Sequence, residues 1–144
     1  RIGRTTAEAF GEDAPELVCE PGRGMCGDAY ALITRVKALR DGANIFLNDG
    51  VYGGLLELPQ IGNLDRLQVL TPKGTPREGE ATARVVFGPT CDSLDRLPGE
   101  LVLPSGIQEG DYLIFHGTGA YSTVTNTRFN GFGQMAHLTV NALE

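Results

Sequence analysis

A thiol and a carboxylate stand side by side at Cys91 and Asp92, directly after a Gly-Pro turn that ends a predicted strand. A neighbouring negative charge disfavours a thiolate, so Asp92 favours the protonated form of Cys91. A cysteine nucleophile needs the opposite, because it is activated by a cation or a helix N-terminus. The pair therefore predicts a proton donor at Cys91. The alternative is a small core residue at the end of a strand, which is the common role of a free cysteine.

A glycine-rich turn at residues 22–27 reads Gly-Arg-Gly-Met-Cys-Gly, a literal GxGxxG, with Asp41 near the acidic spacing of a dinucleotide fingerprint. That fingerprint needs a long helix and a second parallel strand before the acid, whereas residues 30–39 read as a strand. The context therefore disfavours dinucleotide binding. A phosphate site is the more general interpretation, because such a turn exposes backbone N–H groups and Arg23 adds a fork of donors. A tight turn with a surface arginine is the alternative.

A second glycine-rich turn, Gly-Thr-Gly-Ala-Tyr-Ser at residues 117–122, follows a predicted strand at 112–115. The hydroxyl of Tyr121 is placed to donate to a phosphate there, or else the ring packs over the turn. Metal-binding and hydrolase patterns are missing from the sequence. The candidate ligands form no CxxC or HxxxH pair, which argues against zinc, and no serine stands in a nucleophile elbow. These candidate ligands are Cys19, Cys26, Cys91, His116 and His137.

Length and charge narrow the classes of function. A chain of 144 residues is long enough for one modest domain with a real core. The net charge of −6 argues against nucleic acid or an anionic membrane as partner. No apolar run reaches the length of a membrane span, and residues 1–10 lack the apolar region of a signal peptide. Three cysteines without a disulfide-rich pattern fit a reducing cytoplasm.

The first 28 residues have the pattern of a β/α protein. Residues 1–11 show helical spacing of apolar residues, with Gly11 as the stop. The short apolar run at 17–19 is typical of a strand buried on both faces, as in a parallel sheet. A helix that leads into such a strand is half of a β/α repeat, so the chain is expected to begin in the middle of a larger unit.

From residue 29 the pattern changes to short strands separated by turns rich in glycine, proline and aspartate. This pattern predicts a mainly β fold, an antiparallel Greek-key β-barrel or sandwich. One or two helical turns are expected after Gly119, through Thr125. The predicted strands are 29–39, 45–47, 66–70, 82–87, 100–103, 112–115 and 136–140.

Taken together, these motifs resemble the C-terminal part of the fold type III pyridoxal-phosphate-dependent decarboxylases, in the ornithine and lysine decarboxylase group. The resemblance implies that residues 1–28 are the last helix-strand unit of an alanine-racemase-like (β/α)8 barrel and that residues 29–144 are the C-terminal β domain. The motifs follow the family's order along nearly the whole chain. They are Glu-Pro-Gly-Arg at 20–23, Asn-Asp-Gly-Val-Tyr-Gly at 48–53, Gly-Pro-Thr-Cys-Asp-Ser-Leu-Asp at 88–95, Gly-Ala-Tyr at 119–121 and Phe-Asn-Gly-Phe at 129–132.

The resemblance implies a cofactor, pyridoxal 5'-phosphate, and the residues that hold it. Glu20 would face the pyridine nitrogen and keep it protonated, so that the ring can accept electrons. Pro21, Gly22 and Arg23 would lie along the cofactor phosphate, and Tyr121 would close its other side.

The resemblance also implies the substrate-binding residues. Cys91 would return a proton to the α-carbon after CO2 leaves, Asp92 would pair with the distal ammonium of a basic amino acid, and Phe129 would line the pocket. In this family the equivalents of Cys91 and Asp92 reach into the partner subunit's site, so a homodimer with shared active sites is implied.

Two features depart from the family pattern. The lysine that anchors the cofactor lies in an upstream barrel, and neither Lys37 nor Lys73 matches its motif. The barrel segment of the same protein is therefore expected elsewhere, through truncation or cleavage before Arg1. The second departure is an aromatic-acidic pair expected after residues 48–53, which the sequence does not locate. Glu57 is the nearest acid. Because the pair is not placed, ornithine is only the default substrate, and lysine, arginine or another amino acid stays open.

Three functions follow from these observations. The first is a cytoplasmic decarboxylase of a basic amino acid that supplies a polyamine precursor such as putrescine. The second is a catalytically inactive homologue, of the antizyme-inhibitor kind, that binds a partner protein. The joint presence of Glu20, Arg23, Cys91, Asp92 and Tyr121 favours the enzyme. The third is a free-standing β-barrel binding module, which is disfavoured because the half unit at 1–28 would expose an apolar strand.

Overall fold

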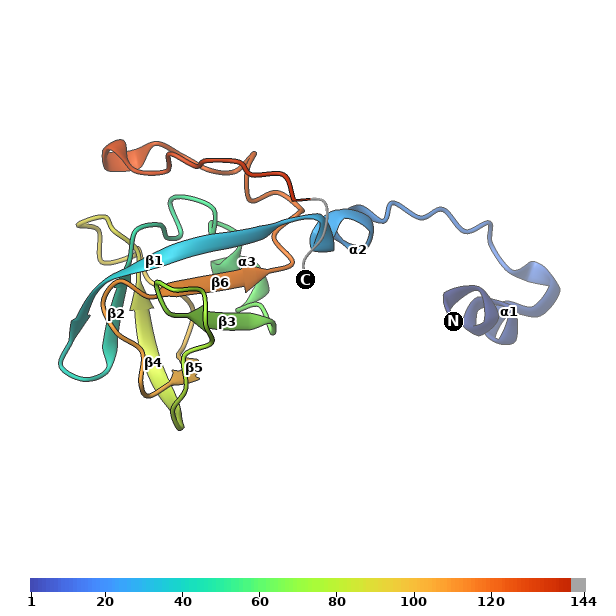
Figure 1. Ribbon diagram of the computed structural model, residues 1–144. Helices are drawn as coiled ribbons and strands as arrows, with labels where there is room; N and C mark the ends of the chain where they lie inside the picture. The colour runs from blue at the N-terminus through green and yellow to red at the C-terminus, as the bar shows by residue number, and fades with distance from the viewer. Residues whose placement is uncertain (141–144) are drawn as a thin grey trace.

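The computed structural model describes residues 1–140, in which six strands form one sheet (Figure 1). Hydrogen bonding orders the strands β3-β6-β1-β2-β4-β5. Most of the predicted runs of β-branched and apolar residues between turn residues give a strand. The strands are β1 (Ala31–Arg40), β2 (Asn44–Leu47), β3 (Leu67–Leu70), β4 (Ala81–Phe87), β5 (Leu101–Pro104) and β6 (Tyr112–His116).

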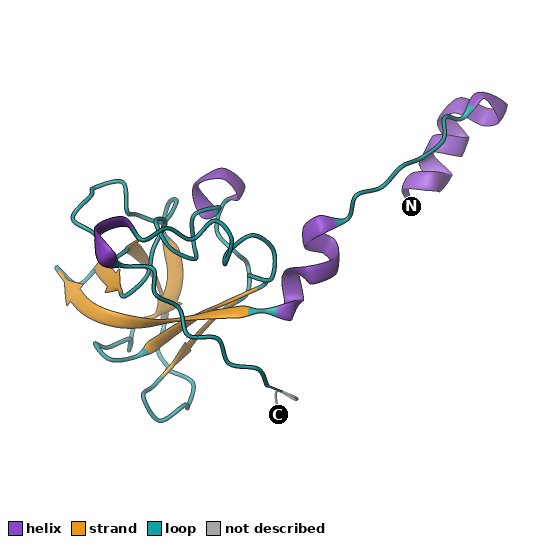
Figure 2. Cartoon of the chain, turned by 90° about the horizontal axis from the view of Figure 1, so that it is seen from above, coloured by secondary structure: helices purple, strands orange, loops and turns teal. Residues whose placement is uncertain are grey.

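Strand β1 organises the sheet, because its two halves pair with different neighbours. Its first half pairs with β6 and its second half pairs with β2, both antiparallel. The register shifts between Val36 and Ala38, and such a bulge bends a strand and increases its twist. The sheet therefore curls into a nearly closed barrel, visible from above in Figure 2. The prediction of a mainly β barrel-like fold is confirmed.

The sheet differs from the predicted antiparallel barrel at one pair of strands. Strand β2 pairs with β4 in parallel, with Asn44 opposite Val85 and Phe46 opposite Phe87. A parallel pair needs a long crossover between its strands. Residues 48–80 supply it, and they carry the helix α3 (Leu58–Ile61) and strand β3.

A single apolar core fills the barrel. Many of the most deeply buried side chains come from β1, β2, β4 and β6, and alternate residues face inward in β1, β2 and β4. Loop residues close the ends of this core. Its buried members include Val36, Ile45, Leu47, Leu55, Val86, Leu97, Leu103, Leu113 and Phe115.

The N-terminal residues stand outside this core. Helix α1 (Ile2–Phe10) ends at Gly11, which has a positive φ of 59°, and it has no buried residue. The predicted helix is therefore confirmed, but the predicted strand at 17–19 is wrong. Residues 14–20 are an extended segment, because a strand exists only beside a hydrogen-bonded neighbour and the described chain offers none there. Helix α2 (Gly22–Cys26) follows.

The predicted strand at 136–140 is also wrong, again because the described chain offers no neighbouring strand. Residues 136–140 were predicted as a strand, yet they have no strand partner, and Leu138 is 87% exposed. After Gly119 there is one hydrogen-bonded turn, closed by the amide of Thr125 on the carbonyl of Tyr121 at 2.9 Å. Three 3-10 turns complete the described elements: Gly11–Asp13, Gly27–Ala29 and Phe129–Gly131.

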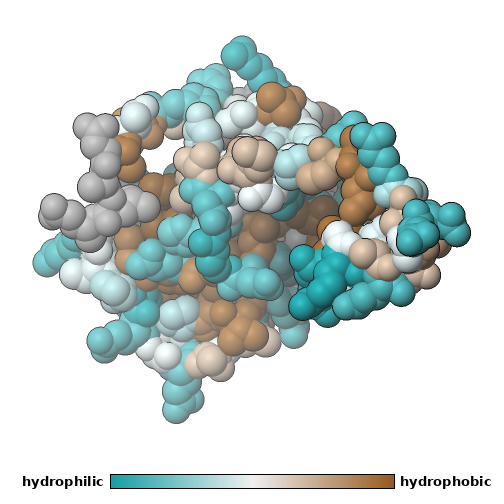
Figure 3. All heavy atoms as spheres, turned by 90° about the vertical axis from the view of Figure 1, so that its right-hand side faces the viewer, coloured by the Kyte–Doolittle hydropathy of each residue, from teal (hydrophilic) through white to brown (hydrophobic). Residues whose placement is uncertain are grey.

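On the side of the molecule that faces α1, apolar side chains are exposed at the surface (Figure 3). Among the residues described, no helix is long and apolar enough to cross a membrane. The exposed apolar residues of the N-terminal segment are Ile2, Phe10, Leu17, Val18 and Met25.

Candidate active site

Three loops that carry predicted site residues meet at one edge of the sheet. Strands β2 and β4 run parallel, and β6 runs in the same direction because β1 is antiparallel to both β2 and β6. The segments that follow these strands, residues 48–58, 88–95 and 117–132, therefore leave from the same edge. Side chains from separate motifs of the sequence are brought together there in two groups.

The first group, the Arg23 cluster, consists of Gly22, Arg23, Glu57 and Tyr121. The guanidinium of Arg23 lies over the ring of Tyr121, 5.8 Å from its centroid, and donates to Glu57 Oε2 at 2.5 Å. A Cβ on Gly22 would lie 3.2 Å from the hydroxyl of Tyr121, so this glycine leaves room beside the phenol. The structure thus brings three predicted phosphate-site residues together from the two glycine-rich turns.

Close backbone contact holds these two turns against each other. The amide of Gly119 donates to the carbonyl of Gly27 at 2.8 Å, and no side chain fits at Gly119 because the carbonyl of Cys26 occupies that space. Tyr121 itself has a φ of 67°, in the left-handed region that favours glycine. This conformation places its ring beside Arg23.

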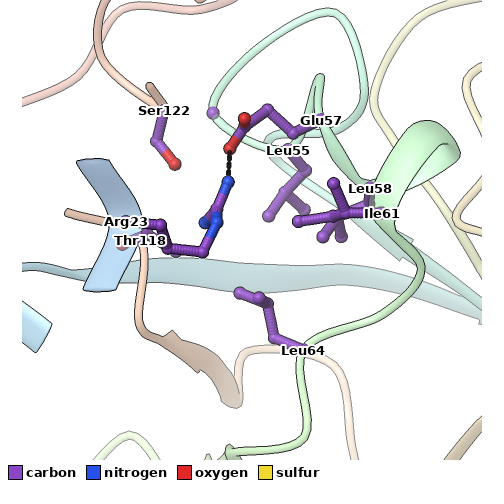
Figure 4. Close-up of a pocket in the computed structure, with 9 residues that line it drawn as sticks. Arg23, Leu55, Glu57, Leu58, Ile61, Leu64, Thr118 and Ser122 are labelled. Atoms are coloured by element: carbon purple, nitrogen blue, oxygen red, sulfur yellow. Dashed lines mark hydrogen bonds and ion pairs between the residues drawn. The ribbon is translucent and has the colours of Figure 1, made fainter. Parts of the chain in front are cut away.

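A small pocket opens beside the Arg23–Glu57 pair (Figure 4). One wall is apolar and comes from α3 and the loops on either side of it. Two buried hydroxyl residues, Thr118 and Ser122, line the opposite side, and Ser122 lies beside the ion pair. The lining residues are Arg23, Gly54, Leu55, Glu57, Leu58, Ile61, Leu64, Thr118 and Ser122.

Glu20 and Pro21 lie next to the Arg23 cluster but contribute backbone rather than side-chain contacts. The carbonyl of Glu20 accepts from the amide of Gly22 at 2.9 Å, and Pro21 is the residue before α2. The carboxylate of Glu20 is exposed and has no hydrogen bond to the rest of residues 1–140. The amide of Gly22 is thus already engaged, which differs from the free donor that the glycine-rich turn predicts.

The second group, the Cys91 cluster, consists of Tyr52, Cys91, Asp92, Phe129 and Asn130. The hydroxyl of Tyr52 donates to Asp92 Oδ2 at 2.5 Å, and the side-chain amide of Asn130 donates to Cys91 Sγ at 3.4 Å. The rings of Tyr52 and Phe129 are 4.5 Å apart between centroids. The cluster therefore joins the three motifs at 48–53, 88–95 and 129–132, and Cys91 is exposed rather than a core residue.

Hydrogen bonding keeps Asp92 charged. The bond from Tyr52 lowers the pKa of Asp92 below its usual 3.8, helped by the amide of Leu94 at 2.9 Å. The same bond raises the pKa of the Tyr52 hydroxyl. Asp92 thus presents a carboxylate whose acceptor atoms are held by Tyr52 and Leu94.

A buried carboxylate, Asp95, fixes the loops beneath the Cys91 cluster. Asp95 is 1% exposed and accepts from the amides of Val51 and Thr90, each at 3.0 Å. Its carboxylate lies so close to Gly50 and Gly88 that neither position has room for a Cβ. One side chain therefore ties the loop that carries Tyr52 to the loop that carries Cys91.

The two clusters remain separate within one chain. Among residues 1–140, no hydrogen bond, ion pair or ring contact connects the members of the Arg23 cluster with those of the Cys91 cluster. They share two loops, since Tyr52 and Glu57 lie on residues 48–58, and Tyr121 and Phe129 lie on residues 117–132.

Several residues of the site were not assigned a role from the sequence. Tyr52, Asp95 and Asn130 lie inside the motifs that carried the resemblance, so their positions were signalled while their contacts were not. Glu57 was the nearest acid to the missing aromatic-acidic pair, but nothing in the local pattern pointed to Arg23. Within the described part of the chain, no three metal-ligating side chains gather.

Comparison with known proteins identifies the family. Residues 18–119 match the model of the pyridoxal-dependent decarboxylase C-terminal sheet domain. The ornithine decarboxylase of Candida albicans is 30% identical over 90% of this chain and 35% of its own length. Antizyme inhibitor 2 of Xenopus laevis is 30% identical over 83% of this chain and 29% of its own length.

Among solved structures, the arginine decarboxylase of Paramecium bursaria Chlorella virus matches with a TM-score of 0.71 and 33% identity, over 92% of this chain and 36% of that one. The chain thus spans about a third of the length of the curated relatives it matches. The chain belongs to the pyridoxal-dependent decarboxylase family, of which it carries the C-terminal sheet domain.

Proposed function

We propose that this chain is the C-terminal part of a pyridoxal-phosphate-dependent decarboxylase that acts on ornithine or a related basic amino acid, in polyamine biosynthesis. The observation that carries the proposal is the convergence of Arg23 and Tyr121, which come from opposite ends of the sequence and meet beside Gly22. A family member that only binds a protein has no need of this arrangement.

The residues of the Arg23 cluster fit a phosphate group. A guanidinium fork recognises phosphate oxygens, and a phenol donates to a further oxygen. When bound, pyridoxal phosphate supplies an electron-withdrawing ring that takes up the electron pair released as CO2 leaves. Glu20, two residues before Gly22, is assigned to the ring nitrogen of that cofactor, as the resemblance implies.

The Cys91 cluster has the groups needed on the substrate side. Asp92 is held as a carboxylate by Tyr52, so it suits the distal ammonium of a diamino acid. Phe129 packs against the ring of Tyr52 at a tilt and gives an apolar wall for the aliphatic part of the substrate. Cys91 is exposed beside Asp92, and its thiol donates a proton to the α-carbon after CO2 leaves.

We assign Cys91, Asp92 and Phe129 to the partner subunit's site in a homodimer, as the resemblance to the decarboxylase family implies. The Arg23 cluster of one subunit and the Cys91 cluster of the other would then form one site. The lysine that anchors the cofactor is assigned to a preceding (β/α)8 barrel, with residues 1–28 as its last unit. The exposed apolar side chains of Ile2, Phe10 and Val18 support this assignment, since a barrel would cover them. Three exposed, unpaired cysteines support a reducing cytoplasm.

The test uses the full-length protein loaded with pyridoxal phosphate and offered ornithine, lysine and arginine in turn. We expect CO2 release from at least one of them. A Cys91→Ala variant should bind the cofactor normally but lose about 10²- to 10⁴-fold in turnover, the usual contribution of a general acid. Ser93→Ala, an exposed change in the same loop, is the control. Normal turnover and normal product in Cys91→Ala would show that the thiol is not the acid.

The similarity to antizyme inhibitor 2 favours one alternative, a non-catalytic homologue that binds a partner protein. That alternative predicts a folded protein that releases no CO2 from any of the three amino acids. Cofactor binding without turnover, with Cys91→Ala indistinguishable from the wild type, would support it over the enzyme.

A further inference from the structure

Glu57 occupies the phosphate end of the candidate cofactor site. Its Oε2 lies 2.5 Å from the Nη2 of Arg23, and its side chain is only 22% exposed (Figure 4). Arg23, whose side chain is 36% exposed, is the only cation that it contacts among residues 1–140. The carboxylate therefore sits against the same guanidinium to which the proposed function assigns the phosphate.

The pocket around Glu57 offers its carboxylate no second cation among the residues that line it. The pocket beside it is lined by apolar residues of α3 and by the hydroxyl residues Thr118 and Ser122. Withdrawal from Arg23 would leave this partly exposed carboxylate without its counter-charge, which is less favourable than the ion pair. The ion pair is thus the preferred state of this site when no other anion is present.

We infer that Glu57 is an internal competitor for the phosphate site: its carboxylate takes the place on Arg23 that the cofactor phosphate takes on binding. The inference rests on the proposed function of the Arg23 cluster. A phosphate carries up to two negative charges, so it outcompetes a single carboxylate for the guanidinium but is repelled by Glu57 while doing so. Glu57 weakens the hold on the phosphate group and leaves contacts with the rest of the cofactor unchanged.

The inference predicts a gain of affinity on removal of the charge. Glu57→Gln keeps the shape of the side chain and removes its charge, so Arg23 becomes free and the phosphate meets no repulsion. Pyridoxal phosphate should then bind about three- to tenfold more tightly, the size expected for one charge at a partly exposed site. Pyridoxal, which lacks the phosphate, should bind the two proteins equally.

The experiment measures equilibrium binding of pyridoxal phosphate and of pyridoxal to the cofactor-free full-length protein, by dialysis and absorbance. The proteins compared are the wild type, Glu57→Gln and the control Glu100→Gln, an equal charge change in the exposed turn before β5. Thermal unfolding of each protein verifies that the variants fold. Tighter binding of pyridoxal phosphate alone, in Glu57→Gln alone, supports the competition.

The remaining outcomes separate the inference from the proposed function. Equal or weaker binding of pyridoxal phosphate to Glu57→Gln overturns the inference and leaves the cofactor site standing, with Glu57 then a residue that orients Arg23. Tighter binding of both ligands also overturns it, because the effect would not act through the phosphate. Failure of the folded wild type and of Glu57→Gln to bind pyridoxal phosphate overturns the proposed function itself.

Discussion

The two clusters at the edge of the sheet are held together by different means. The Cys91 cluster stands on a buried carboxylate, Asp95, whose two oxygens accept from backbone amides of two loops. The Arg23 cluster depends on close backbone contact at Gly119 and on an ion pair between side chains that are partly exposed. The Cys91 cluster is thus held by a buried side chain, and the Arg23 cluster is held by contacts between partly exposed groups.

This difference matches what each cluster is proposed to do. A proton donor must be placed within a few tenths of an ångström of the atom it serves, so its loops need a rigid support. A phosphate site must bind and release a diffusing cofactor, and an ion pair of partly exposed groups exchanges partners at modest cost. Changes at Asp95 should therefore act on folding, whereas changes at Arg23 should act on binding.

Replacement of Asp95 should have the largest effect on stability. Asp95→Ala leaves the buried amide of Val51 and the partly buried amide of Thr90 without acceptors, which is expected to lower the free energy of unfolding by about 2–4 kcal/mol. Asp95→Asn retains one acceptor oxygen and should lose about half as much. Urea unfolding of the full-length protein measures both, with the exposed Asp65→Ala as the control. Equal stability of Asp95→Ala and the control would remove the contrast between the clusters.

Replacement of Arg23 should leave folding intact and weaken the binding of the cofactor. Arg23→Ala removes the guanidinium from the phosphate site, which should reduce the affinity for pyridoxal phosphate about 10- to 100-fold. The free energy of unfolding without cofactor should change by less than about 1 kcal/mol, because the ion pair with Glu57 is partly exposed. Dialysis and urea unfolding on the same samples separate the two effects. A large loss of stability would mean that Arg23 supports the fold instead.

Removal of the Tyr52 hydroxyl should raise the pH at which Asp92 loses its charge. In the wild type the bond from Tyr52 lowers the pKa of Asp92, so the charge of Asp92 persists to lower pH and is lost as pH falls through the lowered value. In Tyr52→Phe the pKa of Asp92 returns toward 3.8, and this charge is lost at a higher pH. NMR titration of the Asp92 carboxyl group measures the change directly. An identical titration in both proteins would show that the bond does not form in solution.

The smallest effect is expected at Asp49, the second buried acid of these loops. Burial raises the pKa of Asp49 above 3.8, so its charged form is disfavoured in the folded state. Its effect on stability is most favourable below pH 3.8 and becomes less favourable as the pH rises through the raised pKa. Asp49→Asn should therefore be neutral or more stable at pH 7, by up to about 1 kcal/mol, and urea unfolding tests it. A clear loss of stability would show that the carboxylate of Asp49, like that of Asp95, is needed as a hydrogen-bond acceptor.

The sequence predicted most strands because each is a short run of β-branched or apolar residues between turn signals, as β4 and β6 are. It failed at 17–19 and 136–140, where short apolar runs lack strand partners in the described chain. A run of apolar residues shows that a segment is to be buried, but it does not show against what. The parallel pairing of β2 and β4 was also missed, because pairing direction depends on how the crossover folds rather than on either strand.

Some members of the candidate site were predicted from the sequence, but their side-chain contacts were not. The motifs indicated Gly22, Arg23 and Tyr121 as one group, and the structure brings them together. The bond from Arg23 to Glu57 joins residues 34 positions apart, and that from Tyr52 to Asp92 joins residues 40 apart. No local pattern encodes such pairs, since they arise only when the loops meet at one edge of the sheet.

The backbone at Tyr121 lies where glycine would be free of strain, and a tyrosine there costs about 1 kcal/mol or more. An engineer seeking only a more heat-resistant protein would therefore choose glycine at this position. The same exchange would delete the ring over which Arg23 lies. Under the proposed function, residue 121 is thus a point where greater thermal stability and retention of the cofactor favour opposite choices.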